Sequence, residues 1–145
     1  MSYFGIGIWY GKHAVNLGTL WRGAYQLGAS FIFTIGDRYK LESADTAKAW
    51  REIPLHRYPD FDTFWASLPY SCPVVGVEMG GESLTEFTHP ERCIYLLGAE
   101  DIGLSAKILA KCHHRIAIPA VRKPSFNVAQ SGTIVMYDRL LKNSN

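Results

Sequence analysis

The 145-residue sequence has few of the features that mark the common classes of protein. Its three cysteines, Cys72, Cys93 and Cys112, are widely spaced and include no Cys-x-x-Cys pair. This spacing favours reduced thiols, with Cys72 and Cys93 in the core, over a disulfide framework or a zinc site. No apolar run approaches the roughly twenty residues that cross a membrane. The first residues carry no basic segment, so we expect no signal peptide and a cytoplasmic protein.

Glycine-rich nucleotide motifs are also missing. No Gly-x-Gly-x-x-Gly follows an apolar run, and no Gly-x-x-x-x-Gly-Lys-Ser/Thr occurs, which excludes ordinary dinucleotide and P-loop sites. The absence of Gly-x-Ser-x-Gly removes the usual argument for a serine hydrolase. The five histidines have no spacing typical of metal ligands, so no metal is expected.

Charge is nearly balanced, with a formal net charge of +2. Bulk electrostatics therefore do not identify a nucleic-acid-binding protein. Basic residues cluster locally at Lys12-His13, at 111–115 and at Arg122-Lys123. Such clusters are most often solvated loop charges. In a symmetric dimer each would occur twice and form a larger phosphate-binding surface.

Short apolar runs alternate with segments of helical periodicity, and the length suits a single domain covering residues 1–145. The expected strands are 3–10, 31–35, 53–58, 73–78, 93–97 and 116–118, and the expected helices are 16–29, 59–68, 105–111 and 128–141, with a short one near 44–50. Continuous apolar strands alternating with helices indicate an α/β fold with a mostly parallel sheet flanked by helices. Ligands bind such sheets at the carboxyl ends of the strands, here after Val77, Leu97 and Ile118.

The stretch from Arg115 to Leu141 combines the elements of a ligand site. A short apolar run ends at Pro119, a basic loop follows, and Ser125-Phe126-Asn127 leads into an apolar helix. Where a strand ends in a loop and the chain returns through a capped helix, backbone groups of the loop and of the helix start face a ligand.

Two further motifs accompany this stretch. Asn16-x-Gly18-x-x-x-Arg22 stands at a predicted helix start, and Leu97-Gly98-Ala99-Glu100-Asp101-Ile102-Gly103 follows a predicted strand. Taken singly, each motif is explained by structure, as a helix cap or a glycine turn. Together, and in this order, the three resemble the motifs of the SPOUT superfamily of RNA methyltransferases, in its SpoU/TrmH-like branch.

The resemblance spans the chain from Asn16 to the last helix and implies several properties. It implies an α/β sheet whose C-terminal segment passes through a loop to form a deep trefoil knot, which the rules of chain topology alone would not predict. It also implies a homodimer, the cofactor S-adenosyl-L-methionine, and transfer of a methyl group to a ribose 2′-hydroxyl of RNA. We expect tRNA as the first substrate and rRNA as the second.

The resemblance also assigns site residues. The cofactor positions it implies are Val77, Gly98, Ile118, Ser125 and Val128, and the catalytic positions are Arg22, Asn16, Glu100, Ser125 and Asn127. A guanidinium stays protonated, so Arg22 is expected to grip a phosphate or stabilise a developing alkoxide rather than act as a base. Glu100 is expected to orient Arg22, and Asn127 to cap the last helix.

Two alternatives remain open on the same fold. One is a non-catalytic RNA-binding or assembly protein, and the other is a SPOUT enzyme that methylates a base. The segment 38–51 matches none of the three motifs and is a candidate for choosing the RNA.

Overall fold

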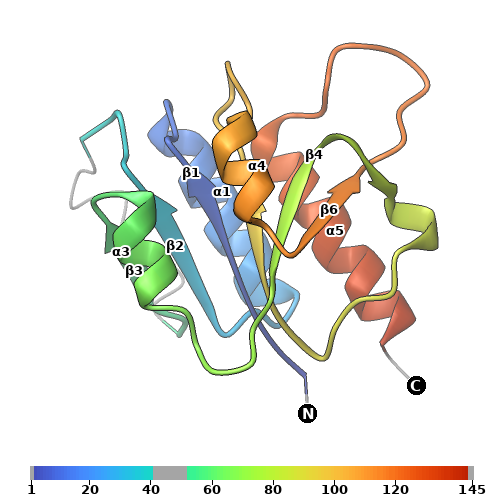
Figure 1. The fold of residues 1–145 in the computed structure, drawn as a ribbon, viewed down its shortest axis with the longest axis horizontal. Coiled ribbons are helices and arrows are strands. Elements are labelled where there is room, and N and C mark those ends of the chain that lie inside the picture. Colours follow the sequence, from blue (N-terminus) through green and yellow to red (C-terminus); the bar gives the residue numbers. More distant parts are fainter. Residues whose placement is uncertain (1, 41–51, 144–145) are drawn as a thin grey trace.

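A computed structural model describes residues 2–40 and 52–143 as one six-stranded sheet with helices on both faces (Figure 1). The strands are β1 (Tyr3–Trp9), β2 (Phe31–Ile35), β3 (Leu55–Tyr58), β4 (Val74–Ser83), β5 (Arg92–Leu97) and β6 (His114–Ala117). The helices are α1 (Ala14–Gln26), α3 (Phe61–Ala66), the 3-10 turn η1 (Leu84–Glu86), α4 (Ala106–Lys111) and α5 (Val128–Lys142). The strand order is β3-β2-β1-β5-β4-β6, and all pairings between these strands are parallel.

Side chains alternate between two cores, one on each face of the sheet. Helices α1 and α5 cover one face, where Leu20, Met136 and Ile6 are buried together. The short helices α3 and α4 cover the other face, where Phe64 and Leu109 pack with alternate residues of the same strands. This two-sided burial explains why the inner strands are continuous apolar runs.

The predicted parallel α/β fold is confirmed, with two differences in detail. Helix α1 begins at Ala14 with His13 at its N-cap, so Asn16 lies in the first turn and does not cap the helix. Strand β4 continues to Ser83, beyond residue 78, where the predicted strand ends. The short helix predicted near 44–50 lies outside the described residues. Within the described ranges, no helix combines the length and apolar character of a membrane span.

An irregularity in β4 shapes the carboxyl edge of the sheet. Strand β6 pairs with β4 on both sides of it, as Val77 and Glu82 both align with Ile116. The intervening residues 78–81 therefore leave the ladder. A bulge of this kind redirects side chains, and this one turns Glu78 and Met79 toward the ends of β5 and β6.

The C-terminal half of α5 is fixed by a buried arginine. Arg139 is only 2% exposed, and its guanidinium donates to the carbonyls of Pro90 and Glu91 (both 2.7 Å) and to the hydroxyl of Tyr95 (3.1 Å). It also lies over the ring of Phe4, 4.8 Å from the centroid. A guanidinium with this many hydrogen bonds can be buried in this way, and it holds α5 against the loop before β5.

His89 is buried beside Arg139, and we expect its protonation to lower the free energy of unfolding in mild acid. Its Nδ1 is 2.6 Å from the hydroxyl of Tyr95 and its Nε2 is 2.7 Å from Asp138, with Arg139 and Lys142 on the same helix. Burial lowers the pKa of His89, although the hydrogen bond to Asp138 opposes this. The unfolded chain, with an ordinary histidine pKa of about 6.5, then takes up the proton first as the pH falls. The contribution of neutral His89 to the free energy of unfolding is thus complete above the pKa of the unfolded chain and is lost progressively below it.

Urea unfolding at about pH 7.5 and about pH 5.5 measures this effect. The free energy of unfolding should be lower at the acid pH, and His89→Gln should remove part of the difference. An equal pH dependence in the wild type and in His89→Gln would contradict the assignment to His89.

Candidate functional site

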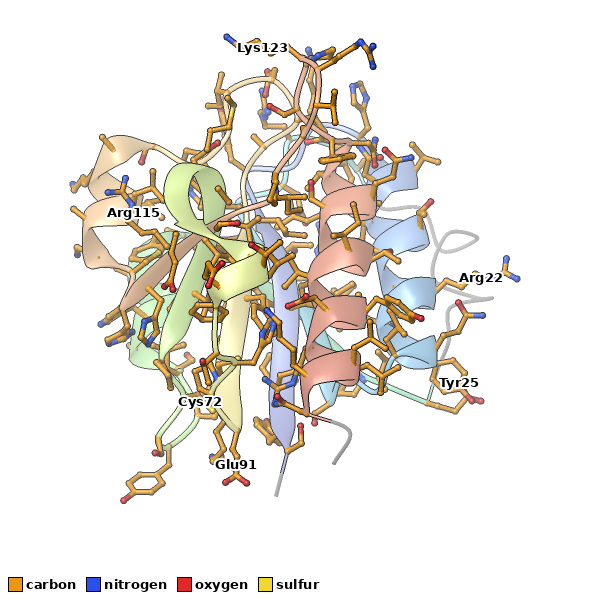
Figure 2. The ribbon with its side chains drawn as sticks, turned by 90° about the vertical axis from the view of Figure 1, so that its right-hand side faces the viewer. Arg22, Tyr25, Cys72, Glu91, Arg115 and Lys123 are labelled. Atoms are coloured by element: carbon orange, nitrogen blue, oxygen red, sulfur yellow. The ribbon has the colours of Figure 1, made fainter. Side chains whose placement is uncertain are left out.

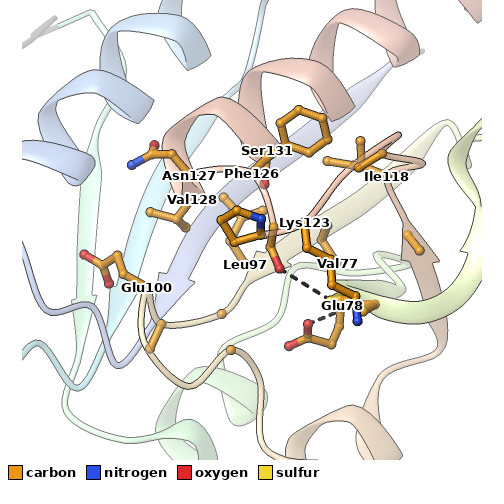
Figure 3. Close-up of a pocket in the computed structure, with 18 of the residues that line it drawn as sticks. Val77, Glu78, Leu97, Glu100, Ile118, Lys123, Phe126, Asn127, Val128 and Ser131 are labelled. Atoms are coloured by element: carbon orange, nitrogen blue, oxygen red, sulfur yellow. Dashed lines mark hydrogen bonds between the residues drawn. The ribbon is translucent and has the colours of Figure 1, made fainter.

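A cavity of about 930 Å³ opens at the carboxyl ends of β4, β5 and β6 (Figure 3). Three loops and the first turns of α5 line it: Val77 to Gly80, Leu97 to Gly103, Ala117, Ile118, Ala120 to Val128, and Ser131. The volume lies in the range of small-molecule and cofactor sites. The cavity occupies the edge of a parallel sheet at which such sites form.

The floor of the cavity depends on two glycines in the loop after β5. A Cβ at Gly98 would overlap the backbone of Gly103 and Leu104, so only glycine allows this close approach. Gly103 has φ of +66°, and a Cβ there would overlap the carboxylate of Glu78. Glu78 accepts a hydrogen bond from the backbone N–H of Leu104 at 2.8 Å and one from Met79 at 2.9 Å. Glu78 therefore joins the loop after β4 to the loop after β5.

Glu100 joins the same β5 loop to the start of α1. Its carboxylate accepts hydrogen bonds from the backbone N–H groups of Lys12 and His13, each at 2.9 Å, and from Nδ2 of Asn16 at 2.8 Å. Partial burial opposes ionisation of Glu100, but these three donors together lower its pKa below the usual value. Glu100 is thus an ionised carboxylate held in place by three donors.

Asn127 extends this network to α5. Its Oδ1 caps the helix by accepting from the N–H groups of Ala129 (2.9 Å) and Gln130 (3.2 Å). Its Nδ2 donates to Oδ1 of Asn16 at 3.1 Å. The capping role predicted for Asn127 is confirmed. Glu100, Asn16 and Asn127 form a continuous chain of hydrogen bonds across the ends of β5, α1 and α5.

The five predicted cofactor positions all line this cavity: Val77, Gly98, Ile118, Ser125 and Val128. Glu100 and Asn127 also line it, while Asn16 lies behind them. Arg22 is not in the lining. Figure 2 shows its side chain extending from α1 away from α5 and from the loop that carries Lys123. Glu100 accepts hydrogen bonds from Lys12, His13 and Asn16, and its role in orienting Arg22 stays a prediction.

Comparison with known proteins identifies the family. The sequence profile of the SpoU rRNA methylase family matches residues 9–137. The chain belongs to the SpoU rRNA methylase family. Membership identifies it as an RNA methylase. Two relatives of known structure were solved with bound AdoMet, which supports S-adenosylmethionine as the methyl donor. No curated protein matched the sequence.

Several solved structures share the fold. A structure concerning 2-OH methylation of C/U34 on tRNA has a TM-score of 0.89 and 23% identity, over 99% of this chain and 97% of that one. The SpoU methyltransferase AviRb of Streptomyces viridochromogenes in complex with AdoMet has a TM-score of 0.86 and 20% identity, over 99% of this chain and 59% of that one. An AdoMet-bound rRNA methyltransferase of Sinorhizobium meliloti has a TM-score of 0.83 and 23% identity, over 96% of this chain and 56% of that one. The chain thus spans a little more than half of the last two proteins.

Two contributors to this SpoU site do not follow from its three motifs. Glu78 is one, and Arg38, which pairs with Asp101 of the second motif, is the other. Glu78 is a carboxylate directly after the apolar run Val74–Val77, a signal that could have been noticed. Arg38 stands in a polar stretch whose sequence gives no indication of a partner 63 residues away.

Proposed function

We propose that the chain transfers a methyl group from S-adenosylmethionine to a ribose 2′-hydroxyl of RNA, with tRNA as the first candidate substrate and rRNA as the second. The observation that carries this proposal is the convergence of the candidate residues. The five cofactor positions, Glu100 and Asn127 come from loops that are far apart in the sequence, yet they line a single cavity. The relative concerned with 2-OH methylation of C/U34 on tRNA supports the choice of ribose and of tRNA.

The residues present suit the cofactor. Adenine needs apolar walls and backbone hydrogen bonds, and Leu97, Ile118 and Val128 supply apolar surface beside the loop backbones. The close approach at Gly98 leaves backbone groups, rather than a side chain, facing the ligand. The bound cofactor supplies a methyl group on a positively charged sulfur. Three carboxylates lie in the lining, those of Glu78, Glu100 and Asp101, and they are compatible with a cationic ligand.

The protein's own residues align the reaction and provide charge. Ser125 and Asn127 lie at the mouth of the cavity next to the exposed Arg122 and Lys123, which are placed to bind RNA phosphates. In-line displacement at a methyl group depends strongly on alignment, which the rigid chain from Glu100 to Asn127 favours. Arg22 would stabilise the 2′-oxygen as it loses its proton.

The position of Arg22 makes a second copy of the chain part of this proposal. A catalytic Arg22 must reach a cavity, and it lies outside the lining of its own. Helices α1 and α5 expose large apolar side chains, including Val15 (72%), Tyr137 (52%) and Leu141 (57%). Burying this surface would drive self-association. We therefore propose a homodimer in which Arg22 of one copy serves the cavity of the other.

We also propose that the C-terminal segment forms the trefoil knot implied by the family resemblance. The doubled pairing of β6 with β4 around residues 78–81, and the long loop 118–127 before α5, support this proposal.

Mass spectrometry of nucleosides tests the reaction. The purified protein is incubated with unfractionated tRNA or rRNA and S-adenosylmethionine, and the RNA is digested and compared with a reaction lacking protein. A new 2′-O-methyl nucleoside is the expected result. A methylated base would favour the base-methylating alternative. The non-catalytic alternative would be favoured by the absence of any product, together with no cofactor binding in calorimetry at about millimolar concentration.

A further inference from the structure

Arg38, three residues beyond β2, connects the ends of three neighbouring strands. Its Nη1 and Nη2 donate to the two carboxylate oxygens of Asp101 at 3.0 and 2.6 Å. Its Nε donates to the carbonyl of Tyr10 at 3.0 Å, and the guanidinium lies 4.1 Å from the centroid of the Tyr10 ring. Every nitrogen of the guanidinium therefore has a partner. The hydrogen bonds from Arg38 hold the pKa of Asp101 well below its usual range.

The segment that Arg38 contacts at the end of β1 is conformationally demanding. Tyr10 has φ of +58°, a region that residues other than glycine seldom adopt. The backbone N–H of Arg38 donates to the carbonyl of Gly11 at 2.9 Å, in addition to the side-chain bond to Tyr10. Such a backbone persists only where its surroundings fix it, and Arg38 supplies two of the fixing contacts.

Asp101 and Glu100 then attach the β5 loop to this same segment. Asp101 reaches it through Arg38, and Glu100 reaches it through the N–H groups of Lys12 and His13. Both acids belong to the wall of the cavity. The position of that wall is thus set by the preorganised fork between Arg38 and Asp101 as well as by the hydrogen bonds of Glu100.

We propose that Arg38 is a positioning residue of the methyl-donor cavity, which acts through Asp101 to hold Glu100 and the loop 98–103 in the cofactor-binding arrangement. This inference rests on the proposed function, because it takes S-adenosylmethionine as the ligand. It adds a residue that belongs to none of the three motifs and that does not line the cavity.

Calorimetric titration of the full chain with S-adenosylhomocysteine, the demethylated cofactor, tests the proposal. Arg38→Gln and Asp101→Asn should each weaken binding about tenfold, since each removes a charge-assisted pair of hydrogen bonds. The double variant should bind no more weakly than either single variant, because both remove the same contact. Arg38→Lys, which keeps the charge and loses the fork, should recover only part of the affinity.

Arg92 provides a matched control, because it lies at the amino end of β5 and the cavity lies at the carboxyl end. It also lies over a tyrosine ring, 4.6 Å from the centroid of Tyr3, and it also donates to a carbonyl, that of Tyr70. Arg92→Gln should leave the affinity for S-adenosylhomocysteine unchanged. The reversed pair Arg38→Asp with Asp101→Arg should bind more tightly than Arg38→Asp alone, which a general loss of stability would not explain.

The outcomes separate the inference from the proposed function. If the wild-type chain binds S-adenosylhomocysteine and Arg38→Gln and Asp101→Asn bind it with the same affinity, the inference is overturned and the proposed function stands. Additive losses in the double variant would also overturn it. A wild-type chain that binds neither S-adenosylmethionine nor its product would overturn the proposed function itself, and the inference with it.

Discussion

Replacing Arg22 by alanine is expected to reduce methyl transfer by on the order of 10² to 10³-fold while leaving S-adenosylhomocysteine binding unchanged. A permanent cation beside the 2′-oxygen stabilises the negative charge that develops there as the proton leaves. Arg22 is an exposed residue of α1 outside the cavity lining, so its loss should not disturb the cofactor contacts. Transfer of a radiolabelled methyl group to RNA, measured alongside calorimetry, separates the two effects.

The adjacent turn of α1 offers a control for this experiment. Gln26 is exposed four residues after Arg22 on the same helix, and Gln26→Ala should keep both activity and binding. Arg22→Lys keeps the charge without the planar fork and should give an intermediate rate. Wild-type turnover by Arg22→Ala would remove the catalytic assignment.

The sequence predicted the central strands well because both faces of the sheet are covered. All five residues of β2 are buried, as are five of the six in β5, so each strand appears as a continuous apolar run. The start of α5 was predictable for a local reason, since Asn127 caps α5 through the N–H groups of Ala129 and Gln130. Burial on two faces and capping are encoded within a few residues.

Contacts between distant residues explain what the sequence did not predict. Asn16 has the chemistry of a cap, yet it binds Glu100 and Asn127, which are 84 and 111 residues away. Residues 80–83 resemble a turn, but Gly81 lies against the backbone of Arg115, where a Cβ would be only 2.7 Å from the carbonyl carbon. The pairing of β4 with β6 decides the structure there, and local propensity cannot reveal it. The role of Arg38 was not predicted for the same reason, because its partner Asp101 is 63 residues away.

Substituting alanine for Gly98 is expected to weaken cofactor binding by roughly five- to a hundredfold, since overpacking a site costs about 1–3 kcal/mol. The new Cβ would overlap the backbone of Gly103 and Leu104. That backbone cannot retreat easily, because Gly103 donates to the carbonyl of Ala99 at 2.8 Å and Leu104 is held by Glu78. The loop must therefore open, and the wall of the cavity moves with it. Titration with S-adenosylhomocysteine measures the loss.

A second glycine-to-alanine change controls for the substitution itself. Gly18 lies inside α1, and a Cβ there meets nothing within 4 Å. Gly18→Ala should raise the free energy of unfolding by up to about 1 kcal/mol and leave cofactor affinity unchanged. Thermal unfolding of both variants shows whether Gly98→Ala is folded when its affinity is measured. Equal affinities for Gly98→Ala and the wild type would show that the loop is not part of the cofactor site.

Co-expression of Arg22→Ala chains with Gly98→Ala chains is expected to restore methyl transfer to about one quarter of the wild-type level, if dimers form at random. In a mixed dimer, the Arg22→Ala chain offers an intact Gly98 cavity and the other chain offers an intact Arg22. One site in each mixed dimer is then complete, and half of the dimers are mixed. If Arg22 served the cavity of its own chain, no site in any dimer would be complete. Activity no higher than that of the two variants assayed separately would therefore exclude a shared site.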